Sequence, residues 1–184
     1  MIKKQQLNAL WSKVFLRRVI EQHHLCFDTE LDIDEDVNFI FSYVLNVERI
    51  RMSKEVLYNT TMENPESLTR RKRDYLCEQL QKAGLRRESM LEKSTLIPAS
   101  RQKIRMALDW LYYRGAYSAA TELFKYSLSK QERRARIKEI CRTFNNRSNR
   151  PRGVRSMLVA LPVRLYMSGL IDFAAQYAIR KRKL

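Results

Sequence analysis

The sequence predicts a mainly helical protein, and three of its features support this fold class. Only 4 Gly and 4 Pro occur in 184 residues, so the chain lacks most of the turns that a many-stranded sandwich or barrel requires. Hydrophobic residues make up 45% of the chain, which supports a packed core and is unlike a disordered chain. Apolar residues recur at helical spacing through most of the sequence. We therefore expect one helical domain, with or without appendages.

The first third of the chain, residues 1–62, is expected to be a near-neutral helical region. Apolar residues on one face predict an amphipathic helix that runs to about Gln22. The acidic stretch 28–36 alternates with apolar residues and is predicted to be a short exposed strand or a loop. The apolar run that follows, 37–47, requires a partner surface.

Residues 63–92 are expected to form a basic linking helix. Asn64 followed by Pro65 is a strong helix start, and the apolar stripe continues to about Met90. The helical pattern then stops in the segment 93–98, which is short, contains β-branched residues and ends with a proline. This segment is the best candidate for a strand.

Two further helices are predicted after this segment. Ser100 can cap a helix over 101–114 that Gly115 ends. Ser118 can cap a second helix whose apolar positions continue to Ile140.

The last part of the chain, 130–184, is expected to be a basic helical extension. It contains a polar loop at 145–153, an apolar stretch over 154–161, a break at Pro162 and a final amphipathic helix.

The positive charge of the chain is confined to its last two thirds. The formal net charge is +16, yet residues 1–62 carry 8 basic and 9 acidic side chains. The remaining 122 residues hold 28 basic against 11 acidic side chains, a net charge of +17. Such a field attracts polyanions. We interpret it as favouring nucleic acid, with an anionic membrane surface or an acidic protein as the next choices.

Several kinds of chemistry lack the residue patterns they need. His23, His24 and Cys26 suggest a metal site only weakly, because no second ligand pair follows at a standard spacing. The four glycines are isolated, so there is no glycine-rich phosphate loop, and no nucleophile or carboxylate pair stands out. We expect neither an enzyme nor a cofactor or metal.

Cysteine usage and hydropathy indicate where the protein works. Three cysteines far apart in sequence argue against a disulfide framework and for a reducing compartment. The longest uncharged stretches are too short to cross a bilayer, and the first residues do not form a signal core. The expected location is therefore the cytoplasm.

The segment 93–129, with a short strand, a capped helix, a Gly turn and a second capped helix, resembles the ribbon-helix-helix family of DNA-binding proteins. The resemblance implies a ribbon-helix-helix core in which one strand per chain pairs across a homodimer and enters the major groove. On this reading the chain is a sequence-specific transcription regulator of the compact kind found on plasmids and other mobile elements, such as those carrying transfer genes. Double-stranded DNA and a second copy are the expected partners, with RNA polymerase or another regulator as a further one and no membrane partner.

The resemblance also assigns roles to residues, with the register of the ribbon left open. Three residues are assigned to base readout: Lys93, Ser94 and Thr95. Six are assigned to DNA phosphates, at the start of the second helix and along the basic run after it: Ser118, Ala119, Lys125, Lys130, Arg133 and Arg134. Seven are assigned to the dimer core: Ile97, Ile104, Ala107, Trp110, Leu111, Leu123 and Phe124.

Two alternatives keep the helices without the ribbon. One is an all-helical RNA-binding protein in which Tyr112, Tyr113 and Tyr117 stack on unpaired bases, or a basic adaptor for acidic partners. The other is a scaffold that binds acidic protein or lipid surfaces through the last helix and the basic residues 180–183.

Overall fold

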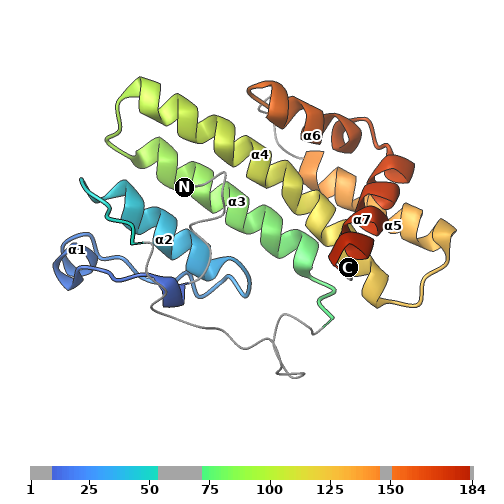
Figure 1. Ribbon diagram of the computed structural model, residues 1–184, viewed down its shortest axis with the longest axis horizontal. Coiled ribbons are helices and arrows are strands. Elements are labelled where there is room, and N and C mark those ends of the chain that lie inside the picture. The colour runs from blue at the N-terminus through green and yellow to red at the C-terminus, as the bar shows by residue number, and fades with distance from the viewer. Residues whose placement is uncertain (1–9, 54–71, 146–150, 183–184) are drawn as a thin grey trace.

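The computed structural model describes residues 10–53, 72–145 and 151–182, and their regular structure is entirely helical (Figure 1). The α-helices are α1 (Arg17–Gln22), α2 (Glu35–Leu45), α3 (Leu76–Lys93), α4 (Pro98–Glu122), α5 (Lys130–Asn145), α6 (Val154–Arg164) and α7 (Ser168–Arg182). Two short 3-10 helices accompany them, η2 (Leu10–Ser12) and η4 (Leu123–Lys125). The prediction of a mainly helical fold is confirmed.

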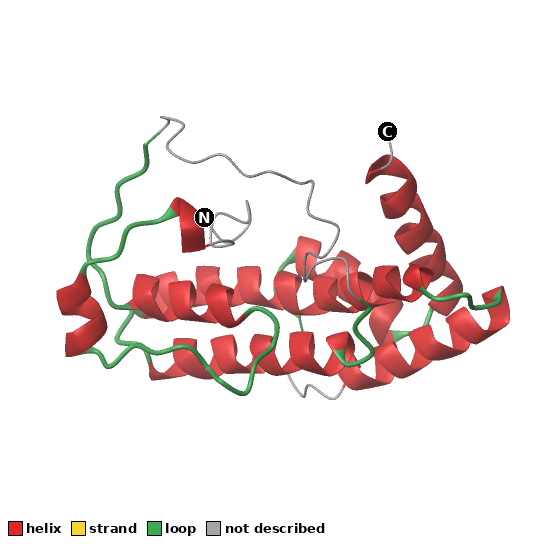
Figure 2. Ribbon diagram, turned by 90° about the horizontal axis from the view of Figure 1, so that it is seen from below, coloured by secondary structure: helices red, strands yellow, loops and turns green. Residues whose placement is uncertain are grey.

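Helix α4 is the centre of the fold. It packs along α3, which α2 covers on its other side, and the later helices α5, α6 and α7 also pack against α4 (Figure 1). In the view turned by 90° the helices form two layers, and the last part of α7 stands out from them (Figure 2). The C-terminal end of α7 is therefore more open to solvent than the helices that surround α4.

The core consists of two clusters, one toward each end of α4. Tyr113 belongs to the larger cluster, where the rings of Tyr112 and Phe144 meet edge to face with centroids 5.1 Å apart. The smaller cluster contains Phe41 of α2 and Leu91 of α3. These buried side chains explain why apolar residues recur at helical spacing in α2, α3, α4 and α5.

A buried polar network ties α2 to α3. The Arg87 guanidinium, almost fully buried, donates to the Asp34 carboxylate at 3.0 Å and to Asn38 Oδ1 at 2.9 Å. Asn38 Nδ2 in turn donates to the Ala83 carbonyl at 3.3 Å. A buried guanidinium needs such partners, so the acidic stretch before α2 has a structural role in neutralising this charge.

The prediction of a ribbon-helix-helix core is wrong for this structure. No strand occurs in the described residues, which include the whole of 93–98. Lys93 is the last residue of α3, and Pro98 is the first residue of α4. Only residues 94–97 separate the two helices, and they form a short connection between antiparallel helices in place of the predicted strand.

The predicted pair of helices after this segment is also wrong. Helix α4 continues through Gly115 and Ser118 as one helix of 25 residues. Gly115 does not adopt a left-handed conformation, and a Cβ placed there would lie 2.9 Å from the Phe144 ring. The glycine therefore allows α5 to approach α4 closely, and it does not end the helix.

Other boundaries differ more modestly. The predicted first helix is interrupted, since residues 13–16 separate η2 from α1. Pro162 does not break the chain but lies in the last turn of α6. The predicted helix start at Asn64 and Pro65 lies outside the described residues, and α3 begins at Leu76.

Candidate functional site

The three residues assigned to base readout lie at the α3–α4 connection. Ser94 caps the end of α3, where its hydroxyl donates to the Leu91 carbonyl at 2.7 Å. The Arg101 guanidinium donates to the carbonyls of Ser94 at 2.7 Å and Leu96 at 3.1 Å, which closes the connection. Lys93 and Thr95 on either side are exposed. The structure brings these residues together as a polar turn, without the strand that base readout through a ribbon requires.

The residues assigned to DNA phosphates are dispersed over the second half of the fold. Ser118 and Ala119 lie inside α4, so their N–H groups are not at a helix start. Lys125 pairs with Glu122 at 2.9 Å. Lys130, Arg133 and Arg134 do lie together, in the first turns of α5.

The residues assigned to a dimer core pack within one chain, except at the α3–α4 connection. Ala107 and Leu123 are buried, and Ile104, Leu111 and Phe124 pack against the two core clusters. Trp110 is half-buried. Ile97 is exposed. The predicted apolar stripe is therefore real, but it serves intramolecular packing.

Much of the positive charge is already paired. Arg133 of α5 donates to both carboxylate oxygens of Asp172 in α7, at 2.5 and 3.3 Å, and both side chains are largely buried. Its guanidinium also lies 4.3 Å from the centre of the Phe124 ring. Further ion pairs join Arg86 to Asp28 and Glu30, Lys82 to Glu30, Arg105 to Glu92 and Arg142 to Glu139. These paired cations are engaged within the fold, so they are less available to a polyanion.

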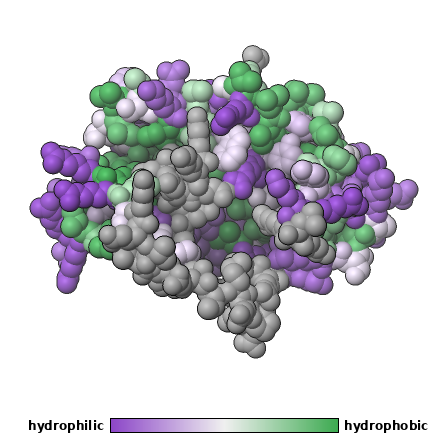
Figure 3. All heavy atoms as spheres, viewed as in Figure 1, coloured by the Kyte–Doolittle hydropathy of each residue, from purple (hydrophilic) through white to green (hydrophobic). Residues whose placement is uncertain are grey.

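Among the described residues, the bundle leaves an apolar surface on α6 uncovered. Large hydrophobic side chains occupy positions three or four residues apart and are more than half exposed: Val154, Met157, Leu158, Leu161 and Leu165. The opposite side of the helix, with Ala160 and Val163, is buried against the protein. Helix α6 is therefore apolar on both sides, and one of them faces solvent (Figure 3, upper right).

Helix α7 continues the same pattern after the corner at 165–167. Its exposed apolar residues are again three or four apart: Met167, Leu170, Phe173 and Tyr177. Ile171 and Ala175 on the other side are buried. With Tyr166 at the corner, ten large hydrophobic residues are exposed on this helix pair, which we call the α6–α7 apolar surface. An exposed apolar surface of this kind is typical of an interaction site.

Basic residues accompany the α6–α7 apolar surface, and free acidic ones are missing from it. Residues 151–182 contain six Lys and Arg side chains against the single acidic residue Asp172, which is bound to Arg133. Arg155 is exposed in the first turn of α6, and Arg180 and Lys181 are exposed at the end of α7. The surface therefore combines apolar contacts with a positive border.

The helices of this surface are too short to cross a bilayer singly. Within the described ranges no helix has both the length and the hydropathy of a membrane span, although α6 and α7 taken together pass that test. The two helices are bent by 118° at the break between them. The described residues also contain no group of three His, Cys, Asp or Glu side chains placed to hold a metal ion.

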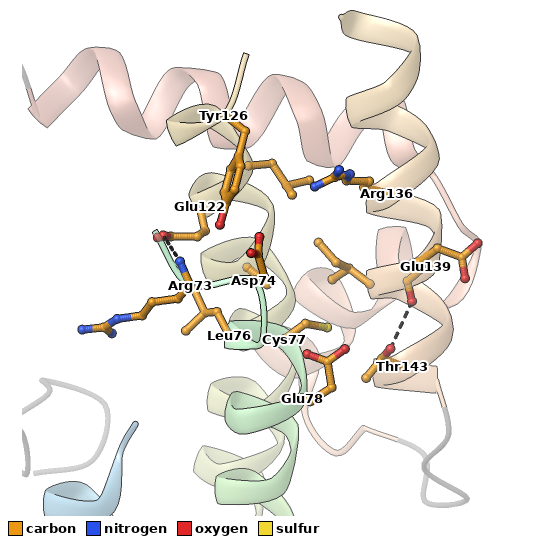
Figure 4. Close-up of a pocket in the computed structure, with 13 residues that line it drawn as sticks. Arg73, Asp74, Leu76, Cys77, Glu78, Glu122, Tyr126, Arg136, Glu139 and Thr143 are labelled. Carbon is orange, nitrogen blue, oxygen red and sulfur yellow. Dashed lines mark hydrogen bonds between the residues drawn. The ribbon is translucent and has the colours of Figure 1, made fainter. Parts of the chain in front are cut away.

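A second candidate site is a small polar cavity between α3, the end of α4 and α5 (Figure 4). Its volume is about 180 Å³, and Glu122 at its edge accepts a hydrogen bond from the Arg73 N–H at 3.2 Å. Burial raises the pKa of the Cys77 thiol to about 11, and burial with the nearby Asp74 carboxylate raises that of Tyr126 to about 12. Both groups are protonated at neutral pH, so this cavity offers no activated nucleophile.

Sequence reasoning placed the DNA-binding core at 93–129, with base readout at Lys93, Ser94 and Thr95. Only its scaffold alternative assigned binding to the last helix, and the exposed apolar residues of α6 were missed. The signal was present, because apolar residues in 154–177 outnumber those that one buried stripe requires. Comparisons with known protein families, with curated proteins and with solved structures find nothing similar to this chain.

Proposed function

We propose that this protein binds peripherally to an anionic membrane surface through the α6–α7 apolar surface. The observation that carries the proposal is the set of ten exposed hydrophobic side chains on two successive helices that are bordered by cations. Helices of this kind lie in the interface of a bilayer, with apolar residues among the acyl chains and Lys or Arg near the headgroups. This departs from the expectation of no membrane partner that belongs to the DNA-binding reading, and it develops the alternative of a scaffold that binds lipid surfaces through the last helix.

The helix lengths favour lying on the membrane over crossing it. Helix α6 has 11 residues and α7 has 15, which correspond to about 16 and 22 Å against a hydrocarbon core of about 30 Å. One side of each helix is buried against α4 or α5. If the helices crossed the membrane, that side would be exposed and the Arg133–Asp172 pair would break. If they lie flat on the membrane, the buried side and the ion pair are both kept.

The charge distribution favours lipid over a second copy of the chain. In a symmetric dimer through this surface, the surface of one copy would pack against the same surface of the other, which brings two positively charged borders together. Like charges brought together in an interface oppose association. Anionic headgroups instead complement this border, with each Lys or Arg near such a surface contributing about 1 kcal/mol. The expected cytoplasmic location agrees with the proposal, since the cytoplasmic leaflet carries the anionic lipids.

Sequence-specific DNA binding remains a prediction of the sequence, without the ribbon that was its basis. Nucleic acid and an anionic bilayer are both polyanions, so the net charge alone does not separate them. The apolar surface separates the two partners, because duplex DNA offers no apolar phase for ten exposed hydrophobic side chains. The decisive experiment therefore changes apolar residues and basic residues separately.

The experiment measures co-sedimentation with vesicles of phosphatidylcholine alone and with phosphatidylserine added, at low and high salt. Leu158 is 66% exposed, and its full burial is worth about 1.5–3 kcal/mol, so inserting its exposed part contributes about 1–2 kcal/mol. The L158E/L161E variant is expected to lose vesicle binding by at least tenfold. The matched control is Ile97→Glu, because Ile97 is also 66% exposed but lies in the α3–α4 connection, at the opposite end of the bundle (Figure 1).

The charge variant R155Q/R180Q/K181Q is expected to lose the preference for phosphatidylserine and to keep weak binding to neutral vesicles. Wild-type protein that binds duplex DNA or RNA and no vesicles would contradict the proposal. A dimer that L158E/L161E dissociates, with no vesicle binding by wild type, would assign the surface to a second copy instead. Equal loss in the Ile97→Glu control would show that the effect is unspecific.

A further inference from the structure

A cavity of about 400 Å³ lies between the middle of α4 and the start of α6. Met106 and Trp110 of α4 form one wall, and residues 152–156 form the other. The volume is within the range of sites that hold small molecules. Val154, which lines the cavity, is also the first residue of the α6–α7 apolar surface, so the cavity borders that surface.

The wall at the start of α6 is held against α4 by specific bonds. The Arg152 N–H donates to the Asp109 carboxylate at 2.9 Å, and the Ser156 hydroxyl donates to the Met106 carbonyl at 2.9 Å. Gly153 adopts a positive φ of 83°, and a Cβ there would lie 2.5 Å from the Met106 methyl group. A glycine is therefore required both by the backbone and by the space, and the cavity has a built shape.

One side of this cavity is arranged for an anion. Arg152 and Arg155 both line it. The N-terminus of α6 also meets the cavity, with no side-chain cap and no acidic residue in its first turn. Guanidinium groups that line a cavity and uncapped helix N–H groups both favour a phosphate oxygen.

The other side of the cavity is apolar, with Met106, Trp110 and Val154 as its lining. We propose that this cavity binds a phosphate group that carries an apolar chain, the chemistry of a phosphate-bearing lipid. The inference rests on the proposed function, because the bordering apolar surface would present such a molecule from the bilayer. The phosphate lies at Arg152 and the start of α6, and the chain lies along Met106 and Trp110.

The test uses Trp110 emission in a Trp11→Phe background, which leaves one indole in the protein. The probes are dodecyl phosphate below its critical micelle concentration, inorganic phosphate and dodecyl maltoside. Saturable binding of dodecyl phosphate is expected, with at least tenfold weaker binding in Arg152→Gln because a charge-assisted contact is lost. Arg152→Lys is expected to restore part of the affinity. Arg17→Gln, an exposed arginine on α1, is the matched control and is expected to bind as wild type.

The outcomes separate this inference from the proposed function. Inorganic phosphate that binds as tightly as dodecyl phosphate would overturn the lipid assignment, and so would equal binding of dodecyl maltoside. Vesicle binding without saturable dodecyl phosphate binding would overturn the cavity alone. Dodecyl phosphate binding that depends on Arg152, in a protein that does not bind vesicles, would overturn the proposed function and keep the cavity.

Discussion

Replacing Asp172 by Asn tests whether the ion pair between α5 and α7 holds the α6–α7 apolar surface in place. The substitution keeps the shape of the side chain and removes its charge. Arg133, whose side chain is 14% exposed, then faces a neutral amide in a site where Asp172 is only 8% exposed. Arg134 also loses a partner, since its Nε lies 3.9 Å from the same carboxylate.

The expected loss is about 3 kcal/mol of unfolding free energy. Breaking a buried ion pair by changing one partner typically costs about 3–5 kcal/mol, because a charge is left uncompensated. The lower end applies here, since Asn still accepts one hydrogen bond and Arg133 keeps its contact with the Phe124 ring. For a chain of this length the loss corresponds to a fall in Tm of roughly 6–12 °C.

Urea unfolding followed by circular dichroism measures this loss, with the midpoint falling by about 1.5 M for a slope near 2 kcal/mol per M. The matched control is Arg142→Gln, which breaks the Arg142–Glu139 pair on the same helix. Both of its side chains are about two thirds exposed, so a change within about 0.5 kcal/mol is expected.

A second variant distinguishes a buried pair from a merely sensitive position. Replacing Arg133 by Met and Asp172 by Leu together removes both charges, and we expect at least half of the lost stability to return. An Asp172→Asn loss no larger than that of Arg142→Gln would refute the assignment of this pair as a buried link. If the Arg133→Met/Asp172→Leu double variant does not regain stability, the loss in Asp172→Asn is caused by packing and not by charge.

Three further predictions concern Gly115 and the cysteines. Gly115→Ala is expected to lower the unfolding free energy by about 1–3 kcal/mol, because the new Cβ would lie 2.9 Å from the Phe144 ring. The loss is expected although alanine favours helix more than glycine does. Thermal unfolding measures the change, and an unchanged or higher Tm would contradict the prediction. Burial raises the pKa of Cys77 and of Cys141 from about 9 to about 11, so stability is expected to fall as pH rises from 9 through 11, where only the unfolded thiols ionise. Thiol labelling at pH 8 followed by mass spectrometry is expected to modify the exposed Cys26 well before the other two, and equal rates in the folded protein would contradict the burial.

Helix positions could be predicted from the sequence better than helix ends. The apolar stripe Ile104, Ala107, Leu108 and Leu111 was predicted and does pack inside, against the smaller core cluster or beside it. The predicted end at Gly115 was wrong because one glycine costs about 1 kcal/mol in a helix, whereas the buried residues on both sides of it stabilise α4 by more. A glycine that permits close packing and a glycine that ends a helix look alike in sequence.

The true start of the next helix has a recognisable signal in the sequence, which apolar spacing alone does not detect. Ser129 and Glu132 form a capping box at the start of α5. The Glu132 N–H donates to the Ser129 hydroxyl at 3.2 Å, and the Ser129 N–H donates to the Glu132 carboxylate at 2.8 Å. This motif marks the start of α5 at Lys130, whereas the residues predicted to begin the second helix at Ser118 belong to α4.

The α6–α7 apolar surface could not be read from periodicity, because these helices are apolar on two sides. The spacing of apolar residues identifies a buried face only when the opposite face is polar. In α6, Ala160 and Val163 are buried whereas Leu158 and Leu161 are exposed, so the small residues contact the protein and the large ones face outward. Small residues at a helix contact let backbones approach closely, and large apolar residues on the outer face would be costly if water were their only neighbour. The larger apolar side chains of α6 and α7 face outward in a basic segment, which is best explained by contact with a second apolar phase. The positive border of this surface makes an anionic bilayer the phase that fits our proposal.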